Sequence, residues 1–261
     1  MKKVICLILC LCLCLVFSLA GCSSKPSSND ASTTILVAAA ASLKNCMDEE
    51  LIPMFQEKNS NIKVEATYDS SGKLQTQIEE GADVDVFMSA AMKQMDALGE
   101  KGLIAEDSIV ELLENKIVLI VPEGSDKGIS SFEEILKVDK IAVGDPASVP
   151  AGQYAKEAFE NLKIWDDVSA KSSLGTNVTE VLNWVAEGSA DAGVVYSTDA
   201  ASNDKVKIVA EAPKGSASKV IYSAGIVKAT ENADAAKSFI EFLKSDEALK
   251  VFESYGFTAI K

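Results

Sequence analysis

The sequence lacks the two residue types that anion sites and active sites use most often. None of its 261 residues is His or Arg, and all 25 basic residues are Lys. The absence of His excludes a Ser-His-Asp triad, a Cys-His dyad and any imidazole metal ligand. The absence of Arg excludes a guanidinium group that clamps phosphate or carboxylate through two hydrogen bonds. Any anion site in this chain must therefore use Lys, neutral hydrogen-bond donors or helix N-termini.

Positive charge and cysteine are also scarce. The chain carries 39 acidic residues and a formal net charge of −14, which argues against nucleic acid and anionic membrane surfaces as partners. Five of the six cysteines fall within the first 22 residues, so only Cys46 remains in the rest of the chain. No disulfide framework is possible there, and we expect Cys46 to be a small core residue.

The first 22 residues predict export. Lys2 and Lys3 precede an apolar run over residues 4–20, which is short for a membrane-spanning helix of about 20 residues. This order is typical of a secretory signal. The small residues before Cys22 resemble the lipobox of bacterial lipoproteins, which implies that Cys22 is acylated and becomes the N-terminus on the outer face of the cell membrane. The alternative is a plain transmembrane anchor.

Two further parts follow Cys22. Residues 23–34 are rich in Ser, Asn, Asp and Thr and predict a flexible tether. From residue 35 onward, apolar runs alternate with helical periodicity, a pattern typical of α/β folds. The predicted strands cover 35–41, 62–68, 84–88, 116–122, 140–144, 192–196, 206–210 and 220–227. The predicted helices cover 43–58, 72–81, 92–100, 151–162, 178–187, 232–244 and 246–255, and Pro53 either kinks or shortens the first of them.

These elements fit either one doubly wound sheet or two lobes. We favour two lobes, because strong strand signals at 116–122 and 220–227 bracket a middle block. Lobe 1 would comprise 35–117 and 225–261, and lobe 2 would comprise 118–224. Each lobe would hold a mixed, mostly parallel sheet flanked by helices, and two crossing strands would form a hinge.

Four strand-to-helix loops carry residues suited to anion binding. Ser42 follows a buried run in the N-cap position, Ser70-Ser71-Gly72 and residues 149–152 open two further helices, and Asn177-Val178 opens a fourth. Ligands bind at the carboxyl ends of strands in open α/β sheets, where helix N-termini offer free N–H groups and partial positive charge. Each loop alone is typical of ordinary helix capping; all four together predict an anion site.

Four segments carry a more specific resemblance. AAAASLKN (38–45), YDSSGKLQTQIEEGADVDVFMSA (68–90), VGDPASVPAGQYAKEAFENL (143–162) and NVTEVLNWVAEGSADAGVVYSTDA (177–200) resemble the molybdate-binding proteins of bacterial ABC importers. The likeness extends to the closing YGF (255–257). It implies a two-lobed periplasmic-binding-protein-like fold of type II, no catalysis and no cofactor.

The resemblance also implies a ligand site. Molybdate or tungstate would be held by Ser42, Ser71, Ala151, Val178 and Tyr196, with no cation ligands. The serines would donate hydroxyl and backbone N–H groups, Ala151 and Val178 backbone N–H groups, and Tyr196 its phenol. The capping argument finds the first four segments but not Tyr196. The implied partners are a permease and its ATPase, with the chain a monomer held at the membrane by lipid alone.

One departure and two alternatives accompany this resemblance. Ala91 stands where family members usually carry Asp, which puts local helix capping in doubt. Ser70 to Lys73 fits the S-x-x-K motif of exported serine acyl-enzymes, although the companion motifs S-D-N and K-T-G are absent. The second alternative keeps the fold and changes the ligand to another tetrahedral oxyanion such as sulfate.

Overall fold

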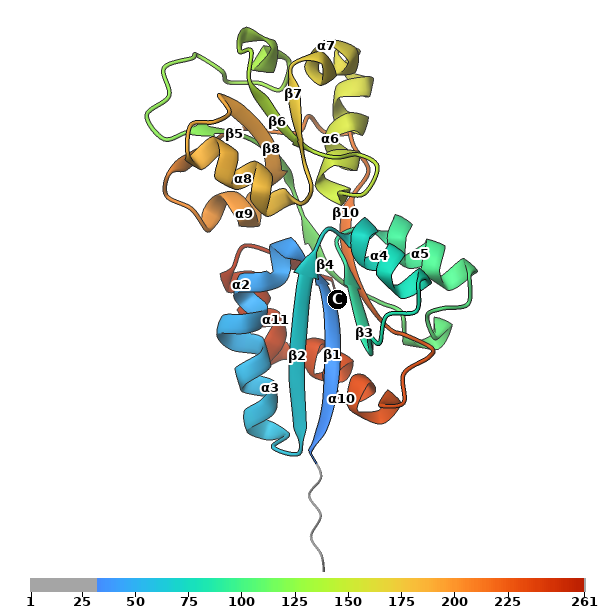
Figure 1. Ribbon diagram of the computed structural model, residues 1–261. Helices are drawn as coiled ribbons and strands as arrows, with labels where there is room; N and C mark the ends of the chain where they lie inside the picture. Colours follow the sequence, from blue (N-terminus) through green and yellow to red (C-terminus); the bar gives the residue numbers. More distant parts are fainter. Residues whose placement is uncertain (1–31, 261) are drawn as a thin grey trace, which may run out of the picture. The chain divides into compact units, whose positions relative to one another are not determined.

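Two mixed β-sheets organise the computed structural model, which describes residues 32–260 (Figure 1). The predicted signal (1–22), the lipidation site Cys22 and most of the tether lie outside the described residues. The tether was predicted to run to residue 34, but the first strand begins at Thr33, because Thr33 and Thr34 pair with the second strand.

The first sheet has six strands in the order β11-β4-β10-β3-β1-β2. Its strands are β1 (Thr33–Ala40), β2 (Ile62–Asp69), β3 (Val86–Ser89), β4 (Val110–Asn115), β10 (Val220–Ile226) and β11 (Thr258–Ala259). β1 pairs in parallel with β2 and β3, whereas β10 runs antiparallel to β3 and β4, and β11 runs antiparallel to β4.

The second sheet has five strands in the order β7-β6-β8-β5-β9. Its strands are β5 (Ile117–Pro122), β6 (Ile141–Gly144), β7 (Ser172–Gly175), β8 (Ala192–Tyr196) and β9 (Val206–Glu211). β6 pairs in parallel with β7 and β8, and β5 runs antiparallel to β8 and β9. The mixed sheets are confirmed, but parallel pairs are not the majority in either sheet. The antiparallel strand β5 is buried along its length and therefore shows the continuous apolar run that is typical of parallel strands.

The chain passes between the two sheets at two points. Lys116 joins β4 to β5, and residues 212–219 join β9 to β10. All of β10 pairs within the six-stranded sheet, so the predicted lobe boundary between residues 224 and 225 cuts through a strand that the structure keeps whole. Residue 117 likewise belongs to β5 of the other sheet.

Helices flank both sheets (Figure 1). They are η1 (Ala41–Leu43), α2 (Lys44–Cys46), η2 (Met47–Leu51), α3 (Ile52–Lys58), α4 (Ser71–Glu79), α5 (Met92–Glu100), η3 (Glu106–Ser108), η4 (Glu133–Lys137), α6 (Pro150–Asn161), α7 (Trp165–Ala170), α8 (Val178–Ala186), α9 (Ser197–Ala201), α10 (Ala233–Leu243) and α11 (Asp246–Ser254). All seven predicted helices are confirmed. The strands β4, β7 and β11 and the helices α7 and α9 were not predicted.

The predicted helix over residues 43–58 is one continuous helical run that changes type along its length. A π-helical segment, η2, precedes α3, and Pro53 lies in the first turn of α3. Proline has no N–H for an intrahelical hydrogen bond, and the π-helical segment just before Pro53 is where the pattern of backbone hydrogen bonds changes. Pro53 therefore neither ends the helical run nor shortens it.

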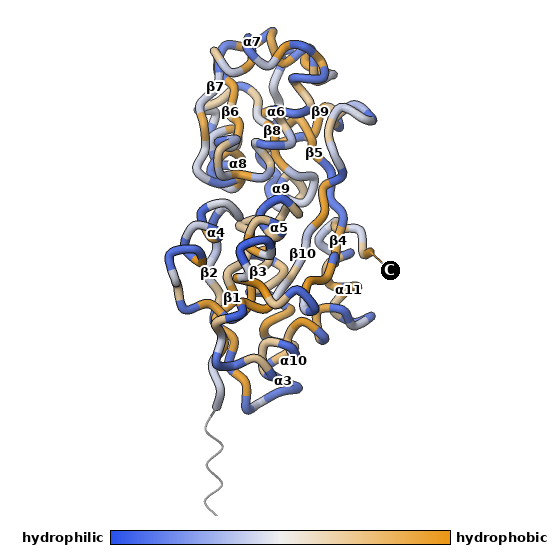
Figure 2. Tube along the Cα trace, turned by 90° about the vertical axis from the view of Figure 1, so that its right-hand side faces the viewer, coloured by the Kyte–Doolittle hydropathy of each residue, from blue (hydrophilic) through white to orange (hydrophobic). Residues whose placement is uncertain are grey.

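Apolar residues concentrate along the strands and the inner helix faces, drawn in orange in Figure 2. Cys46 belongs to this core at 1% exposure, and its thiol donates a 3.1 Å hydrogen bond to the Leu43 carbonyl. Burial raises the pKa of the Cys46 thiol to about 12, so it stays protonated and unreactive. Within residues 32–260, no helix combines the length and the apolar character needed to cross a bilayer.

Candidate anion-binding site

The five residues predicted for ligand binding line one pocket. They come from five separate segments: η1, the starts of α4, α6 and α8, and the end of β8. The residues are Ser42, Ser71, Ala151, Val178 and Tyr196. The cavity has a volume of about 200 Å³, counting the part open to solvent. The tertiary structure thus brings together residues more than 150 positions apart in sequence.

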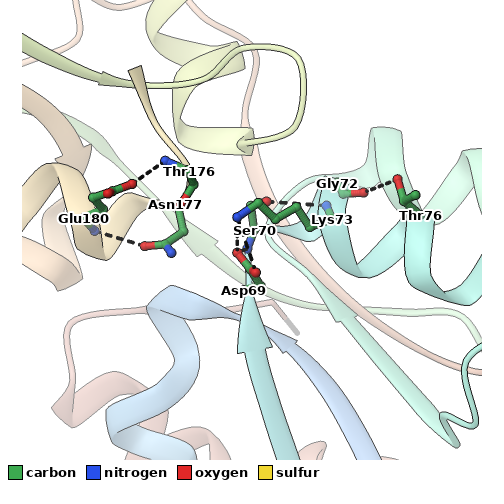
Figure 3. A network of polar contacts seen from close by, with 8 residues as sticks. All are labelled: Asp69, Ser70, Gly72, Lys73, Thr76, Thr176, Asn177 and Glu180. Carbon is green, nitrogen blue, oxygen red and sulfur yellow. Dashed lines mark hydrogen bonds and ion pairs between the residues drawn. The ribbon is translucent and has the colours of Figure 1, made fainter. Parts of the chain in front are cut away.

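Side chains cap two of the helices at the pocket (Figure 3). The Ser70 hydroxyl accepts a 3.4 Å hydrogen bond from the Lys73 backbone N–H at the start of α4. At the start of α8, the Asn177 amide oxygen accepts a 3.0 Å hydrogen bond from the Glu180 N–H, which confirms Asn177 as the N-cap. Ser71 and Val178 are then the first residues of their helices, where the backbone N–H has no partner inside the helix.

The start of α6 is held at the pocket by close backbone packing. Val149 is the N-cap, without a side-chain hydrogen bond, and Pro150 is the first helical residue. A Cβ atom on Gly152 would lie 1.9 Å from the Gly144 carbonyl oxygen, so only glycine lets the helix begin this close to the end of β6. This approach leaves Ala151 in the first turn, with its N–H unused inside the helix.

Ser42 reaches the pocket by a different route from the one predicted. We expected it to be a helix N-cap, but the helical run starts one residue earlier, at Ala41, and its N-cap is Ala40. The Ser42 hydroxyl lies 2.8 Å from the Tyr222 hydroxyl on β10. The N-cap assignment is therefore wrong, because the chain turns into a 3-10 helix directly at the end of β1.

The Ser71 hydroxyl is fixed by a backbone donor. The Ala90 N–H, just after β3, donates a 3.0 Å hydrogen bond to the Ser71 oxygen. Ser71 is fully buried. Because its oxygen already accepts this hydrogen bond, the hydroxyl hydrogen remains available to a ligand in the pocket.

Tyr196 ends β8 with its phenol inside the pocket wall. The side chain is 1% exposed, and within residues 32–260 its hydroxyl oxygen has no hydrogen-bond partner. A buried hydroxyl without a partner costs roughly 1–3 kcal/mol, which a ligand would recover. Burial raises the pKa of Tyr196 well above its usual value, so the phenol remains a donor. Sequence patterns gave no signal for this residue beyond an aromatic at a strand end.

One acidic residue also borders the pocket. The carboxylate of Asp69 accepts a 2.7 Å hydrogen bond from the Ser70 N–H and lies 3.3 Å from the Lys73 ammonium (Figure 3). The sequence pointed to neutral donors at this site and gave no indication that a carboxylate would line it as well. Its negative charge is offset by these two partners rather than left facing the pocket unpaired.

The two sides of the pocket meet in a direct backbone contact. The Gly72 N–H in α4 donates a 2.9 Å hydrogen bond to the Ser148 carbonyl, in the loop before α6. A Cβ atom on Gly72 would lie 2.4 Å from that carbonyl oxygen. Residue 72 must therefore be glycine for the helix and the loop to touch in this way.

Residues 35–258 match the family described as bacterial extracellular solute-binding protein. The chain belongs to this family. Two mixed sheets with flanking helices and a pocket between helix starts give it the type II periplasmic-binding-protein fold. The prediction of family and fold class is thereby confirmed.

Individual relatives extend the match over nearly the whole chain. The protein YvgL of Bacillus subtilis (strain 168), named as an ABC transporter substrate-binding lipoprotein, is 45% identical over 92% of this chain and 93% of its own. The molybdate-binding protein ModA of Haemophilus influenzae is 39% identical over 88% of this chain and 91% of its own. A substrate-binding domain named for a molybdenum ABC transporter of Clostridium difficile is 40% identical, with a TM-score of 0.68, over 88% of this chain and all of that one.

The contacts of Ser70 and Lys73 argue against the acyl-enzyme alternative. The Ser70 hydroxyl serves as a helix cap, and its contact with Lys73 is through the backbone N–H rather than the amine. The Lys73 amine instead pairs with Asp69, and the Lys73 side chain is 39% exposed. A Lys base for serine needs a desolvated amine beside the hydroxyl, whereas the Lys73 side chain is partly exposed and paired with Asp69.

One smaller expectation also has an outcome in the structure. Ala91 is the N-cap of α5 and provides no side-chain hydrogen bond, which confirms the doubt about capping there. No group of three or more His, Cys, Asp or Glu side chains within residues 32–260 is arranged to hold a metal ion.

Proposed function

We propose that this solute-binding protein captures molybdate or tungstate in the pocket between its two sheets. The observation that carries the proposal is the convergence of Ser42, Ser71, Ala151, Val178 and Tyr196 on one cavity. The H. influenzae relative is named as a molybdate-binding protein, and the C. difficile domain is named for a molybdenum transporter. Molybdenum would thus be bound as its oxyanion and not as a metal cation.

Neutral donors are sufficient for such a ligand. The site provides about seven donors: two serine hydroxyls, a phenol and the backbone N–H groups of four helix starts. Each hydrogen bond to a charged partner contributes roughly 1.5–3 kcal/mol. After the costs of association, such a set reaches the region of about −12 kcal/mol that corresponds to nanomolar binding. The partial positive charge at the helix starts adds to this and outweighs the screened long-range repulsion from an acidic protein.

Donor spacing would set the selectivity. Donors fixed by helix backbones enclose a cavity of one size, and molybdate and tungstate have longer metal–oxygen bonds than sulfate and phosphate. We expect both large oxyanions to bind and the smaller ones to bind weakly. Asp69 provides the acceptor that a protonated phosphate needs, but its carboxylate is occupied by Ser70 and Lys73.

The remaining steps of transport follow the same proposal. The passages at Lys116 and residues 212–219 would act as the two-strand hinge between lobes. Proteins of ABC transporters that bind substrate work with a permease and an ATPase, and we infer that these are the partners of this chain. A lipid on Cys22 would hold the monomer outside the cell membrane, with no cofactor, no nucleic acid and no catalysis involved.

Titration calorimetry tests the ligand directly. The protein is titrated with molybdate, tungstate, sulfate and phosphate at constant ionic strength. We expect tight binding of the first two and at least 100-fold weaker binding of the others, an interval of about 2.7 kcal/mol. Sulfate binding as tight as molybdate binding would contradict the size argument and favour the other-oxyanion alternative.

A further inference from the structure

A buried hydrogen-bond network lies directly behind Ser42. Its first member is Tyr222 on β10, which is 1% exposed and whose hydroxyl lies 2.8 Å from the Ser42 oxygen. The second member is Asn115, the last residue of β4, whose side-chain nitrogen lies 3.4 Å from the Tyr222 hydroxyl oxygen. Distance alone leaves open which hydroxyl donates in the Ser42–Tyr222 pair.

The orientation of the Asn115 amide is fixed independently. The Lys116 backbone N–H, which can only donate, lies 2.8 Å from the Asn115 side-chain oxygen, and the Ser197 hydroxyl donates to the same oxygen at 2.9 Å. The amide nitrogen must then face the other way. Its two hydrogens are directed to the Thr198 hydroxyl at 2.9 Å and to Tyr222.

This orientation sets the direction of every bond that follows. The amide nitrogen of Asn115 has no lone pair to offer, so the Tyr222 oxygen accepts from it. Within residues 32–260, Ser42 is then the acceptor left for the Tyr222 hydrogen. Burial raises the pKa of Tyr222 well above its usual value, so its hydroxyl keeps its hydrogen near neutral pH. With its oxygen occupied as an acceptor, Ser42 keeps its own hydrogen free for the pocket.

We propose that Tyr222 is a positioning residue, oriented by Asn115, that holds the Ser42 hydroxyl as a donor toward the bound oxyanion. The proposal rests on the proposed function, because it assigns a direction to one of the five ligand contacts. Without Tyr222, the Ser42 hydroxyl has no fixed partner and must be ordered by the ligand itself. The same logic operates at Ser71, where a backbone N–H does what Tyr222 does for Ser42.

The test is a double-mutant cycle measured by molybdate calorimetry on protein produced from the full-length sequence. Tyr222→Phe keeps the ring and removes the hydroxyl. We expect it to weaken binding about tenfold in the wild-type background, consistent with weakening one hydrogen bond to a charged partner. In the Ser42→Ala background we expect it to change affinity less than twofold, because the residue it positions is gone. In the matched Ser71→Ala background, Tyr222→Phe should again weaken molybdate binding about tenfold.

Thermal unfolding of each variant shows that it is folded before its affinity is compared. An unchanged affinity in Tyr222→Phe overturns the inference. A tenfold loss that persists in the Ser42→Ala background also overturns it, because Tyr222 would then act through general packing. The wild-type titration is a separate result: no molybdate binding there contradicts the proposed function itself.

Discussion

The two sides of the pocket provide their donors in different ways. The side of the six-stranded sheet presents the hydroxyls of Ser42 and Ser71, each of which already has a hydrogen-bond partner behind it. The side of the five-stranded sheet presents the backbone N–H groups of Ala151 and Val178 and the phenol of Tyr196. A hydroxyl both donates and accepts, so its direction must be imposed by neighbours, whereas a backbone N–H only donates. The hydroxyls of the first side therefore depend on side-chain and backbone partners behind them, whereas the second side, apart from the Tyr196 phenol, depends on helix placement.

The largest expected effect comes from separating the two sides. In Gly72→Ala, the added Cβ atom would lie only 2.4 Å from the Ser148 carbonyl oxygen, so the two segments must move apart. The backbone of residue 72 is not in the left-handed region, so alanine itself causes no strain there. The variant should fold but fail to bring the two sides together. We expect molybdate affinity to fall by roughly 100-fold or more in calorimetry, because the arrangement in which the two sides touch would be scarcely populated.

Gly99→Ala is the matched control for this variant. Gly99 lies in α5 on the same side, and its nearest neighbour to an added Cβ atom is the Ile109 side chain at 3.8 Å. We expect unchanged affinity there. Equal affinities in the two variants would show that the contact at Gly72 is not needed for binding.

The next prediction compares hydroxyl donors with backbone N–H donors. Ser71→Ala removes a hydroxyl donor, and Ser42→Ala does the same, so each should weaken binding by roughly 10- to 100-fold, as expected for one hydrogen bond to a charged ligand. Val178→Ala leaves the backbone N–H in place and should change affinity by less than about threefold. Calorimetry with thermal unfolding as a folding check distinguishes these outcomes. Equal losses on both sides would contradict the contrast.

A buried carboxylate makes the five-stranded side sensitive to pH. Asp199 in α9 is 7% exposed and accepts a 3.1 Å hydrogen bond from the Tyr196 N–H. Burial raises its pKa from 3.8 to about 7. Between about pH 4 and pH 7 the folded protein therefore binds more protons at Asp199 than the unfolded chain, and this group's contribution to stability falls as the pH rises.

Asp199→Asn removes this titration while keeping an oxygen that accepts from Tyr196. Relative to wild type, we expect its free energy of unfolding to improve by on the order of 2 kcal/mol on going from pH 5 to pH 8, since one pKa unit corresponds to about 1.36 kcal/mol. Denaturant unfolding at the two pH values measures this change. A difference from wild type that is the same at both values would contradict a raised pKa.

The smallest effect concerns a missing helix cap on the six-stranded side. Ala91 is the N-cap of α5 and makes no side-chain hydrogen bond, whereas Ser70 and Asn177 cap α4 and α8. Ala91→Asp should raise the free energy of unfolding by about 1 kcal/mol, the usual contribution of an N-cap side chain. Denaturant unfolding measures it, and a destabilised variant would show that the buried position does not tolerate the carboxylate.

Local sequence patterns predicted most elements and four of the five pocket segments. Helix periodicity and the residues that favour helix starts located the first residues of α4, α6 and α8 to within about one residue, because capping is a short-range interaction. The short strands β4, β7 and β11 were missed, since they carry too few apolar residues for a two-residue period to stand out. The resemblance to a known family, and no local pattern, pointed to Tyr196.

The sequence by itself determined what kind of site this protein has: with neither His nor Arg, an anion must be held by neutral donors and helix N-termini. It also determined where along the chain the helices that carry these N–H donors begin. Only the tertiary structure decided that five segments share one cavity, that Ser42 bonds to Tyr222 instead of capping a helix, and that Gly72 touches Ser148. These contacts join residues dozens to more than 150 positions apart, and nothing in a local pattern specifies the partner of a residue across the fold.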